Sequence, residues 1–283
     1  MNILYLVFGE EQRNHTQAYF SICSFLGQMD NSDRIYILTD APRFYQRVAE
    51  RVNIVEINKG LLEEWEGEYR FFLRVKIKAI EYICSIHPHE DVLYVDTDTF
   101  LYSDIKEIKM TFDNPLMHVN EGKLSSLKSK TERIMWKQVG KKSFGGIVIS
   151  PDHYMWNASV VGLPSKIGMN IVKLALIICD NMLLAKVNKK LIEQFALSVA
   201  MAEFGNVKSA SENIGHYNRN NIEWNAVINR FLQESLLCVR PLDQDIEIVK
   251  NWDFTAISVQ QRVSVKRINL KRYLRHFSLL FKK

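Results

Sequence analysis

Residues 91–103 read DVLYVDTDTFLYS, and this stretch decides the fold prediction. Its apolar run at 92–95, rich in β-branched and aromatic residues and bounded by polar ones, is typical of a buried central strand. Asp96 and Asp98 follow with one residue between them. Alternate side chains of an extended chain share a face, so both carboxylates can converge on one cation. The alternative is that the two aspartates only cap or turn the chain after the strand.

The position of these aspartates favours the metal site. In an open α/β sheet, ligands bind at the carboxyl ends of the strands. Oxygen ligands of this kind suit Mg²⁺ or Mn²⁺, and these ions in turn suit a diphosphate. The length of the apolar run before Asp96 also favours a strand end over an isolated turn.

The residues before this stretch alternate between strand and helix patterns. This alternation predicts an α/β fold with a mostly parallel central sheet and helices on both faces. The expected strands cover 2–8, 34–38 and 53–57, the expected helices cover 17–26, 43–51 and 69–86, and 61–68 are expected to form a link. The first expected strand ends at Phe8 and Gly9, and the second ends at Thr39 and Asp40. These four residues are therefore expected to lie beside a ligand.

The pattern changes beyond residue 103. We expect strands near 115–119, 145–149 and 158–163, and helices near 131–139, 167–185, 188–204 and 222–237. No repeat or low-complexity linker interrupts them. The economical prediction is one domain over residues 1–261, with a nucleotide-binding half at 1–103 and an acceptor-facing half at 104–261.

Length and composition restrict the class of protein. The 283 residues are 47% apolar and 24% charged, which is enough to bury one large core. The longest apolar candidate for a membrane span, at 171–179, is too short. The first residues lack a basic region and a cleavage site for a signal peptide, so we expect a cytoplasmic protein.

The net charge of +5 is concentrated at the end of the chain. Residues 262–283 carry eight Lys or Arg and no acid, so the rest of the chain has a net charge of −3. That distribution argues against nucleic-acid binding, which would need basic residues across a folded face. Leucines and aromatics at helical spacing predict a basic amphipathic helix at 262–283. It suits either the inner, anionic surface of a membrane or packing on the acidic body.

Five motifs occur in an order that resembles GT-A glycosyltransferases, and in particular family 8, which includes glycogenin and bacterial lipooligosaccharide galactosyltransferases. The motifs are RVKIKAIEYI (74–83), LYVDTDTFL (93–101), MWNASVVGL (155–163), IEQFALS (192–198) and GHYNRNN (215–221). The resemblance runs over residues 2–224. It implies the GT-A fold and metal-dependent transfer of a hexose from a nucleotide-diphospho-sugar to a glycan or lipid-linked glycan. The expected donor is UDP-glucose or UDP-galactose, with retention of configuration.

The resemblance also implies a metal site. Asp96 and Asp98 would hold Mn²⁺ or Mg²⁺, and His216 would be the third protein ligand. Arg74 matches an arginine near the diphosphate and the donor sugar, and the two aromatics before it suggest that it points into a cleft. An ordinary solvated helix charge is the alternative for Arg74.

Further matches concern the reacting sugar. Asn157 begins an Asn-Ala pair that holds the donor sugar in the family, but Ser159 stands where the family has glycine. Glu193 and Gln194 match an acidic residue and a glutamine that face the sugar. With Asp98, these residues are implied to take part in the transfer.

One departure from the family concerns the diphosphate. Family members usually place a lysine five or six residues after the histidine, and this chain has Asn221 and Ile222 there. Arg219 is a candidate replacement, because a guanidinium also binds phosphate.

Two alternatives remain at this point. Haloacid-dehalogenase-type phosphatases also place paired aspartates after a strand, but Phe100 departs from their motif and no later acidic pair follows an apolar strand. The missing lysine and Ser159 also allow a binding protein that has lost transferase activity.

Overall fold

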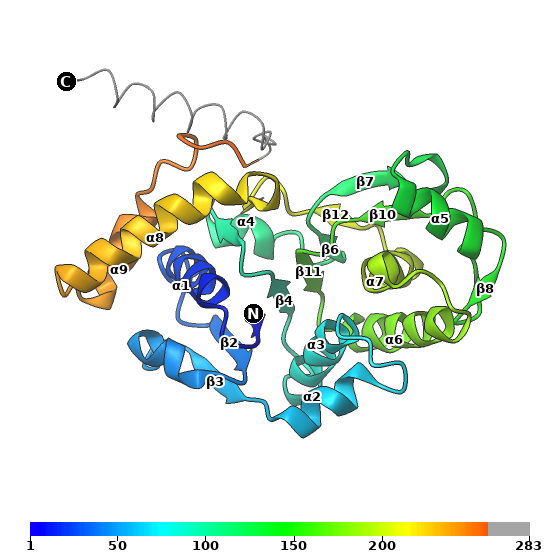
Figure 1. Cartoon of the computed structure of the whole chain (residues 1–283), viewed down its shortest axis with the longest axis horizontal. Helices are drawn as coiled ribbons and strands as arrows, with labels where there is room; N and C mark the ends of the chain where they lie inside the picture. The colour runs from blue at the N-terminus through cyan, green and yellow to red at the C-terminus, as the bar shows by residue number, and fades with distance from the viewer. Residues whose placement is uncertain (260–283) are drawn as a thin grey trace, which may run out of the picture.

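The structure is a computed structural model of the chain, and it describes residues 1–259. The amphipathic helix expected at 262–283 lies outside the described residues. A seven-stranded sheet crosses the molecule (Figure 1). Its order is β12 (Lys208–Ser209), β6 (Leu116–Met117), β11 (Val160–Leu163), β4 (Val92–Val95), β1 (Asn2–Val7), β2 (Arg34–Thr39) and β3 (Asn53–Glu56).

The sheet is mostly parallel, as the sequence predicts. Strands β4, β1, β2 and β3 pair in parallel, and β6 pairs in parallel with β12. Only β11 runs against its two neighbours, β4 and β6. Because Val160 at the start of β11 pairs with Val95 at the end of β4, the loop before β11 lies beside the aspartates after β4.

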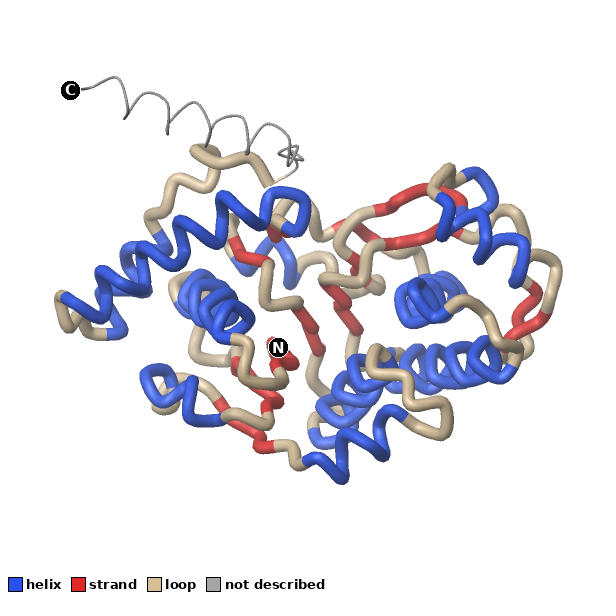
Figure 2. The backbone as a smooth tube through the Cα atoms, in the orientation of Figure 1, coloured by secondary structure: helices blue, strands red, loops and turns tan. Residues whose placement is uncertain are grey.

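Alternate residues of the sheet enter two separate hydrophobic cores. Leu4 and Tyr94 pack with α3 (Arg74–Ile86), α6 (Gly168–Leu184) and α7 (Ile192–Phe204) on one face. Tyr5 and Val95 pack with α1 (Gln12–Leu26), α8 (Asn221–Leu237) and α9 (Leu242–Lys250) on the other. This is the period-2 alternation of a strand covered on both sides. Figure 2 shows the helices flanking the strands.

Shorter elements complete the fold. Three small antiparallel pairs are β5 (Thr99–Leu101) with β13 (Ile214–His216), β7 (Asn120–Lys123) with β10 (Tyr154–Trp156), and β8 (Ser143–Phe144) with β9 (Ile147–Val148). The remaining α-helices are α2 (Lys59–Glu66), α4 (Ile105–Lys109) and α5 (Lys130–Val139). The 3₁₀ helices are η1 (Pro42–Val48), η2 (Leu124–Ser126), η3 (Lys189–Leu191) and η4 (Asn218–Asn220).

Several expected boundaries were wrong. The expected link at 61–68 is mostly helix α2, which begins because the Asn58 side chain accepts a hydrogen bond from the Leu61 amide. Gly67 ends α2 with a φ of +70°, a conformation that favours glycine. Helix α3 therefore begins at Arg74 and not at 69. Within residues 1–259, no helix combines the length and apolarity needed to cross a bilayer.

Candidate metal centre

The two aspartates lie in a tight turn directly after β4. The Asp96 amide donates to the Ser159 carbonyl at 2.8 Å, which extends the β4–β11 pairing by one bond. The Thr99 hydroxyl donates to the Asp96 carbonyl at 2.7 Å and closes the turn. Asp98 then leads into β5. The turn that carries both carboxylates is therefore held at one end by the pairing of β4 with β11 and at the other by the pairing of β5 with β13.

His216 reaches this turn through the pairing of β13 with β5. His216 is opposite Thr99 in the register, and its Nε2 lies 3.3 Å from Oδ1 of Asp98. Gly215 is opposite Phe100, and a Cβ added at Gly215 would lie 2.5 Å from the Phe100 ring. The absence of a side chain at 215 therefore allows the close approach of the two strands.

These residues fit a divalent cation. One ligand atom from each of Asp96, Asp98 and His216 can be chosen so that all three lie within 4.8 Å of one another. Two carboxylates and an imidazole suit Mn²⁺ or Mg²⁺. The three predicted ligands thus come together from distant parts of the chain as a possible metal site.

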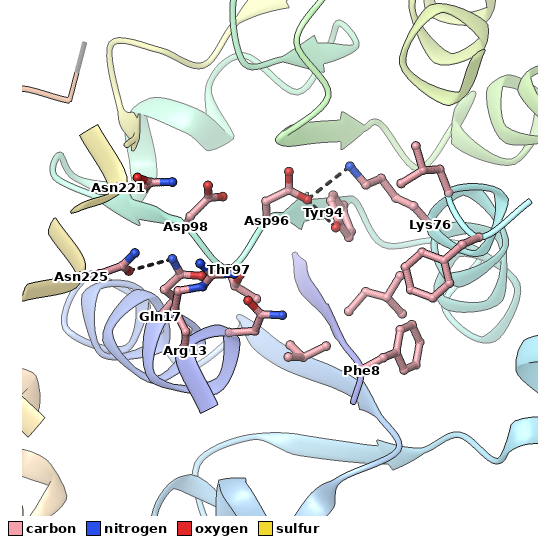
Figure 3. Close-up of a pocket in the computed structure, with 15 residues that line it drawn as sticks. Phe8, Arg13, Gln17, Lys76, Tyr94, Asp96, Thr97, Asp98, Asn221 and Asn225 are labelled. Carbon is pink, nitrogen blue, oxygen red and sulfur yellow. Dashed lines mark hydrogen bonds and ion pairs between the residues drawn. The ribbon is translucent and has the colours of Figure 1, made fainter. Parts of the chain in front are cut away.

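Lys76 contacts one of the three candidate ligands, and no sequence prediction included it. Its Nζ lies 3.2 Å from Oδ1 of Asp96 and 3.2 Å from Oε1 of Glu193, and it donates to the Ala158 carbonyl at 3.1 Å. Figure 3 shows Lys76 reaching from α3 to Asp96, whose Oδ1 also accepts from the Tyr94 hydroxyl at 2.6 Å.

Burial and charge oppose each other in this cluster. Burial acts to lower the pKa of Lys76, but Asp96 and Glu193 outweigh it and raise that pKa. Burial also acts against ionisation of Asp96, yet Lys76, the Tyr94 hydroxyl and His216 lower its pKa. The pKa of Glu193 is raised, because its burial outweighs the attraction of Lys76. A charged Lys76 is therefore held between the two acids.

The expected placement of Arg74 in the cleft is wrong. Its guanidinium forms two hydrogen bonds to Asp180, at 2.7 and 3.0 Å, and a third to the Trp65 carbonyl at 2.8 Å. Residues two apart on a helix do not share a face. The cation that faces the site is therefore Lys76, two residues further along α3.

A cavity of about 410 Å³, the first cavity, opens in front of the aspartates (Figure 3). Its polar lining comprises Arg13, Asn14, Gln17, Lys76, Asp96, Thr97, Asp98, Asn221 and Asn225, and Phe8 contributes an apolar wall.

The strand ends beside Phe8 meet as expected. The Gly9 amide donates to the Asp40 carboxylate at 2.9 Å, which joins the ends of β1 and β2. Thr39 is buried, and its hydroxyl accepts from the Ala41 amide at 3.1 Å. Gly9, Thr39 and Asp40 do not line the first cavity, although Phe8 does.

A larger cavity of about 690 Å³, the second cavity, lies on the His216 side. Its lining includes His118, Glu121, Glu132, Asn157, His216, Arg219 and the aromatic residues Phe100, Tyr102 and Phe254. Arg219 therefore lines a different cavity from Asp96 and Asp98.

Glu121 joins two residues that the sequence predicted separately. Its carboxylate accepts from the Asn157 amide at 3.4 Å and from the Gln194 amide at 3.2 Å. Glu121 lies on β7, outside all five motifs, and no pattern in the sequence marks it.

His118 packs against the metal-site histidine. Its ring is edge-on to His216, with 5.3 Å between the centroids, and it shares a 3.0 Å hydrogen bond with the Ile214 carbonyl through Nε2. Burial, and then the charge of His216, lower the pKa of His118 to about 4. A neutral His118 therefore has Nε2 protonated, because a carbonyl only accepts.

No protein-family model and no curated protein matches the sequence. Among solved structures, the galactosyltransferase LgtC, in complex with donor and acceptor sugar analogs, matches with a TM-score of 0.51. It is 14% identical and covers 74% of each chain. Mouse xyloside xylosyltransferase 1 matches at 0.48 and 10% identity, over 74% of this chain and 85% of its own. An active-site mutant of LgtC matches at 0.47 and 16% identity, over 74% and 72%. The sheet order and the LgtC match together show that this chain has the GT-A fold of glycosyltransferases.

Proposed function

We propose that this protein is a metal-dependent glycosyltransferase that moves a hexose from a nucleotide-diphospho-sugar to a glycan or lipid-linked glycan. UDP-glucose or UDP-galactose is the proposed donor. The observation that carries the proposal is the convergence of Asp96, Asp98 and His216 at the carboxyl end of β4. In an open α/β sheet, this is where ligands bind.

The leaving diphosphate accumulates negative charge as the sugar departs. Neutralisation of that charge by a Lewis acid is the chemistry that Mn²⁺ or Mg²⁺ would supply when held by Asp96, Asp98 and His216. The chain adds a fixed cation of its own, because Lys76 lies within 3.2 Å of Asp96 and lines the same cavity. Positive charge positioned before the reaction is usually a large part of catalysis.

The two cavities suggest a division of the substrates. The first cavity, formed mainly by residues of the 1–103 half, suits the nucleotide diphosphate. The second cavity, formed mainly by residues of the 104–261 half, suits the acceptor, because its aromatic rings, amides and carboxylates are the groups that bind sugars. Asn157 and Gln194, joined by Glu121, would orient the donor sugar between them. Glu193 would act by holding Lys76.

The fold argues against the phosphatase alternative, because the chain shares its fold with a sugar transferase. The alternative of an inactive binding protein predicts binding of a UDP-sugar without turnover. Hydrolysis of a sugar nucleotide in the absence of acceptor separates the two, since water replaces the acceptor only when the donor bond is activated.

The test is a panel of sugar nucleotides incubated with the full chain and Mn²⁺, with release of the nucleoside diphosphate as the readout. We expect hydrolysis of a UDP-hexose that EDTA abolishes. Asp98→Ala should reduce the rate at least a hundredfold while the circular dichroism and the melting temperature of the metal-free protein stay close to wild type. Asp113→Ala, at an exposed site outside both cavities, is the control. Metal-dependent hydrolysis at a normal rate by the Asp98→Ala variant would refute the assignment.

A further inference from the structure

The described cationic side chains that line the first cavity are Arg13 and Lys76. Lys76 is already held by Asp96, Glu193 and a backbone carbonyl. Arg13 forms no ion pair or side-chain hydrogen bond with any residue in 1–259. The first cavity therefore contains one cation whose charge is not matched by the protein.

The other candidates for this role lie elsewhere. Arg74 is paired with Asp180. Arg219 lines the second cavity. Asn221, at the start of α8, lines the first cavity but carries no charge. A diphosphate in the first cavity would therefore meet Arg13 as the available guanidinium.

The helix that carries Arg13 lacks a side-chain cap at its start. Arg13 lies in the first turn of α1, which contains no acidic residue, and Glu11 at the N-cap makes no capping hydrogen bond. The neighbouring Glu10 pairs with Arg43. A cation at a helix N-terminus adds to the positive end of the helix dipole and is unfavourable by itself. A bound anion would relieve this repulsion.

The wall that presents Arg13 is tied to the metal site. Gln17 lies one turn after Arg13 on the same helix face. Its side chain donates to Asn225 of α8 at 2.8 Å and accepts from the Thr97 hydroxyl at 3.3 Å. Thr97 separates the two aspartates, so α1, α8 and the metal-site turn are joined (Figure 3).

We propose that Arg13 binds the phosphate groups of the nucleotide donor and takes the place of the lysine that residues 221 and 222 do not supply. A guanidinium presents several parallel N–H donors to phosphate oxygens, which makes it suited to this task. The inference rests on the proposed function, because it assumes that a nucleoside diphosphate occupies the first cavity. It assigns the phosphate contact to α1 and not to the Arg219 turn.

The experiment is titration calorimetry of the full chain with UDP in the presence of Mn²⁺, repeated with inorganic pyrophosphate. Arg13→Gln should weaken binding of both about tenfold to a hundredfold, as expected for loss of hydrogen bonds from a charged group. The affinity for Mn²⁺ alone should not change. Arg219→Gln is the matched control, and it should bind UDP and pyrophosphate as wild type does.

A compensating variant strengthens the test. Because Asn221 lines the same cavity, Asn221→Lys in the Arg13→Gln background should restore most of the lost affinity for pyrophosphate. The inference is overturned if wild type binds manganese pyrophosphate and Arg13→Gln binds it equally well. It is also overturned if Arg219→Gln alone weakens binding. If wild type binds neither UDP nor pyrophosphate with Mn²⁺, the proposed function fails first and the inference fails with it.

Discussion

Arg74 and Lys76 are two residues apart on α3, yet their charged groups reach different parts of the molecule. The Arg74 guanidinium pairs with Asp180, which belongs to α6. The Lys76 ammonium pairs with Asp96 and Glu193 beside the candidate metal site. The first contact joins two helices, whereas the second neutralises acids that a metal and its substrate would also contact.

Lys76→Met should destabilise the metal-free protein by about 3 kcal/mol, because it leaves the buried Glu193 and the partly buried Asp96 without their cation. Mn²⁺ should restore more stability to this variant than to wild type, since it supplies a new positive charge at Asp96. Chemical denaturation with and without Mn²⁺ measures both effects.

The contrast is Arg74→Ala, which removes a partly buried pair and should cost about 1–3 kcal/mol. That cost should be the same with and without Mn²⁺. An equal response of the two variants to Mn²⁺ would contradict the separate roles.

Glu121→Ala should lower the turnover number of sugar-nucleotide hydrolysis about tenfold, because the amides of Asn157 and Gln194 lose the carboxylate that orients them. The affinity for UDP should stay within about twofold of wild type, since Glu121 does not line the first cavity. Steady-state kinetics and calorimetry separate these quantities. Glu132→Ala is the control, because Glu132 lines the same cavity but bonds to the Ser129 amide. Equal losses in both variants would show that Glu121 has no special role.

Gly215→Ala should weaken Mn²⁺ binding about tenfold, because the added Cβ pushes β13 away from Phe100 and moves His216. Overpacking should also cost about 1–3 kcal/mol of stability. Manganese titration, followed by electron paramagnetic resonance, measures the affinity. Gly60→Ala in α2 should leave Mn²⁺ affinity unchanged, since alanine is favoured within helices and α2 contributes no residue to the candidate metal site or the first cavity. Normal Mn²⁺ affinity in the Gly215→Ala protein would show that β13 has room to adjust.

His118 should make the metal-free fold sensitive to mild acid. Burial lowers the pKa of His118 to about 4 in the folded chain, from an ordinary value of 6.5. Below pH 6.5 the unfolded chain therefore binds a proton that the folded chain rejects. The contribution of neutral His118 to the free energy of unfolding is fully present above pH 6.5, and it is lost progressively as the pH falls to about 4. Between pH 7 and pH 5 the loss from this residue should be about 2 kcal/mol.

Denaturation of wild type and His118→Gln at the two pH values measures that contribution. His216, Asp96 and Asp98 also act on the His118 ring and remain in the variant, so their own titration is common to both proteins. An identical loss of stability in the two proteins would contradict the assignment to His118.

Much of the fold followed from local patterns. The apolar run before Asp96 predicted a buried strand, and the alternation of strands and helices before it predicted the parallel half of the sheet. The antiparallel direction of β11 was not predicted, because a short apolar run has no direction until its partners are known. The helix at 59–66 was missed because the acidic and aromatic residues there resembled a link. The start of this helix is set by one hydrogen bond, which the Asn58 side chain accepts from the Leu61 amide.

The sequence predicted those site residues that the family motifs mark, and it missed those that only their contacts in the folded chain define. His216 was predicted from motif order and lies beside Asp98. Lys76 was missed because only the rotation of α3 in the folded chain shows that Lys76 faces inward while Arg74 faces Asp180. Glu121 is recognisable only through its hydrogen bonds to Asn157, directly after β10, and to Gln194 of α7, which no spacing in the sequence reveals.

The pairing of β13 with β5 has a consequence for biosynthesis. Both acids of the candidate metal site leave the ribosome long before the imidazole does, because His216 follows Asp98 by 118 residues (216 − 98). A nascent protein that has folded its first strands still lacks the third ligand. Tight retention of manganese is therefore expected only from a chain whose translation has passed β13, so metal uptake would report that β13 has left the ribosome and paired with β5.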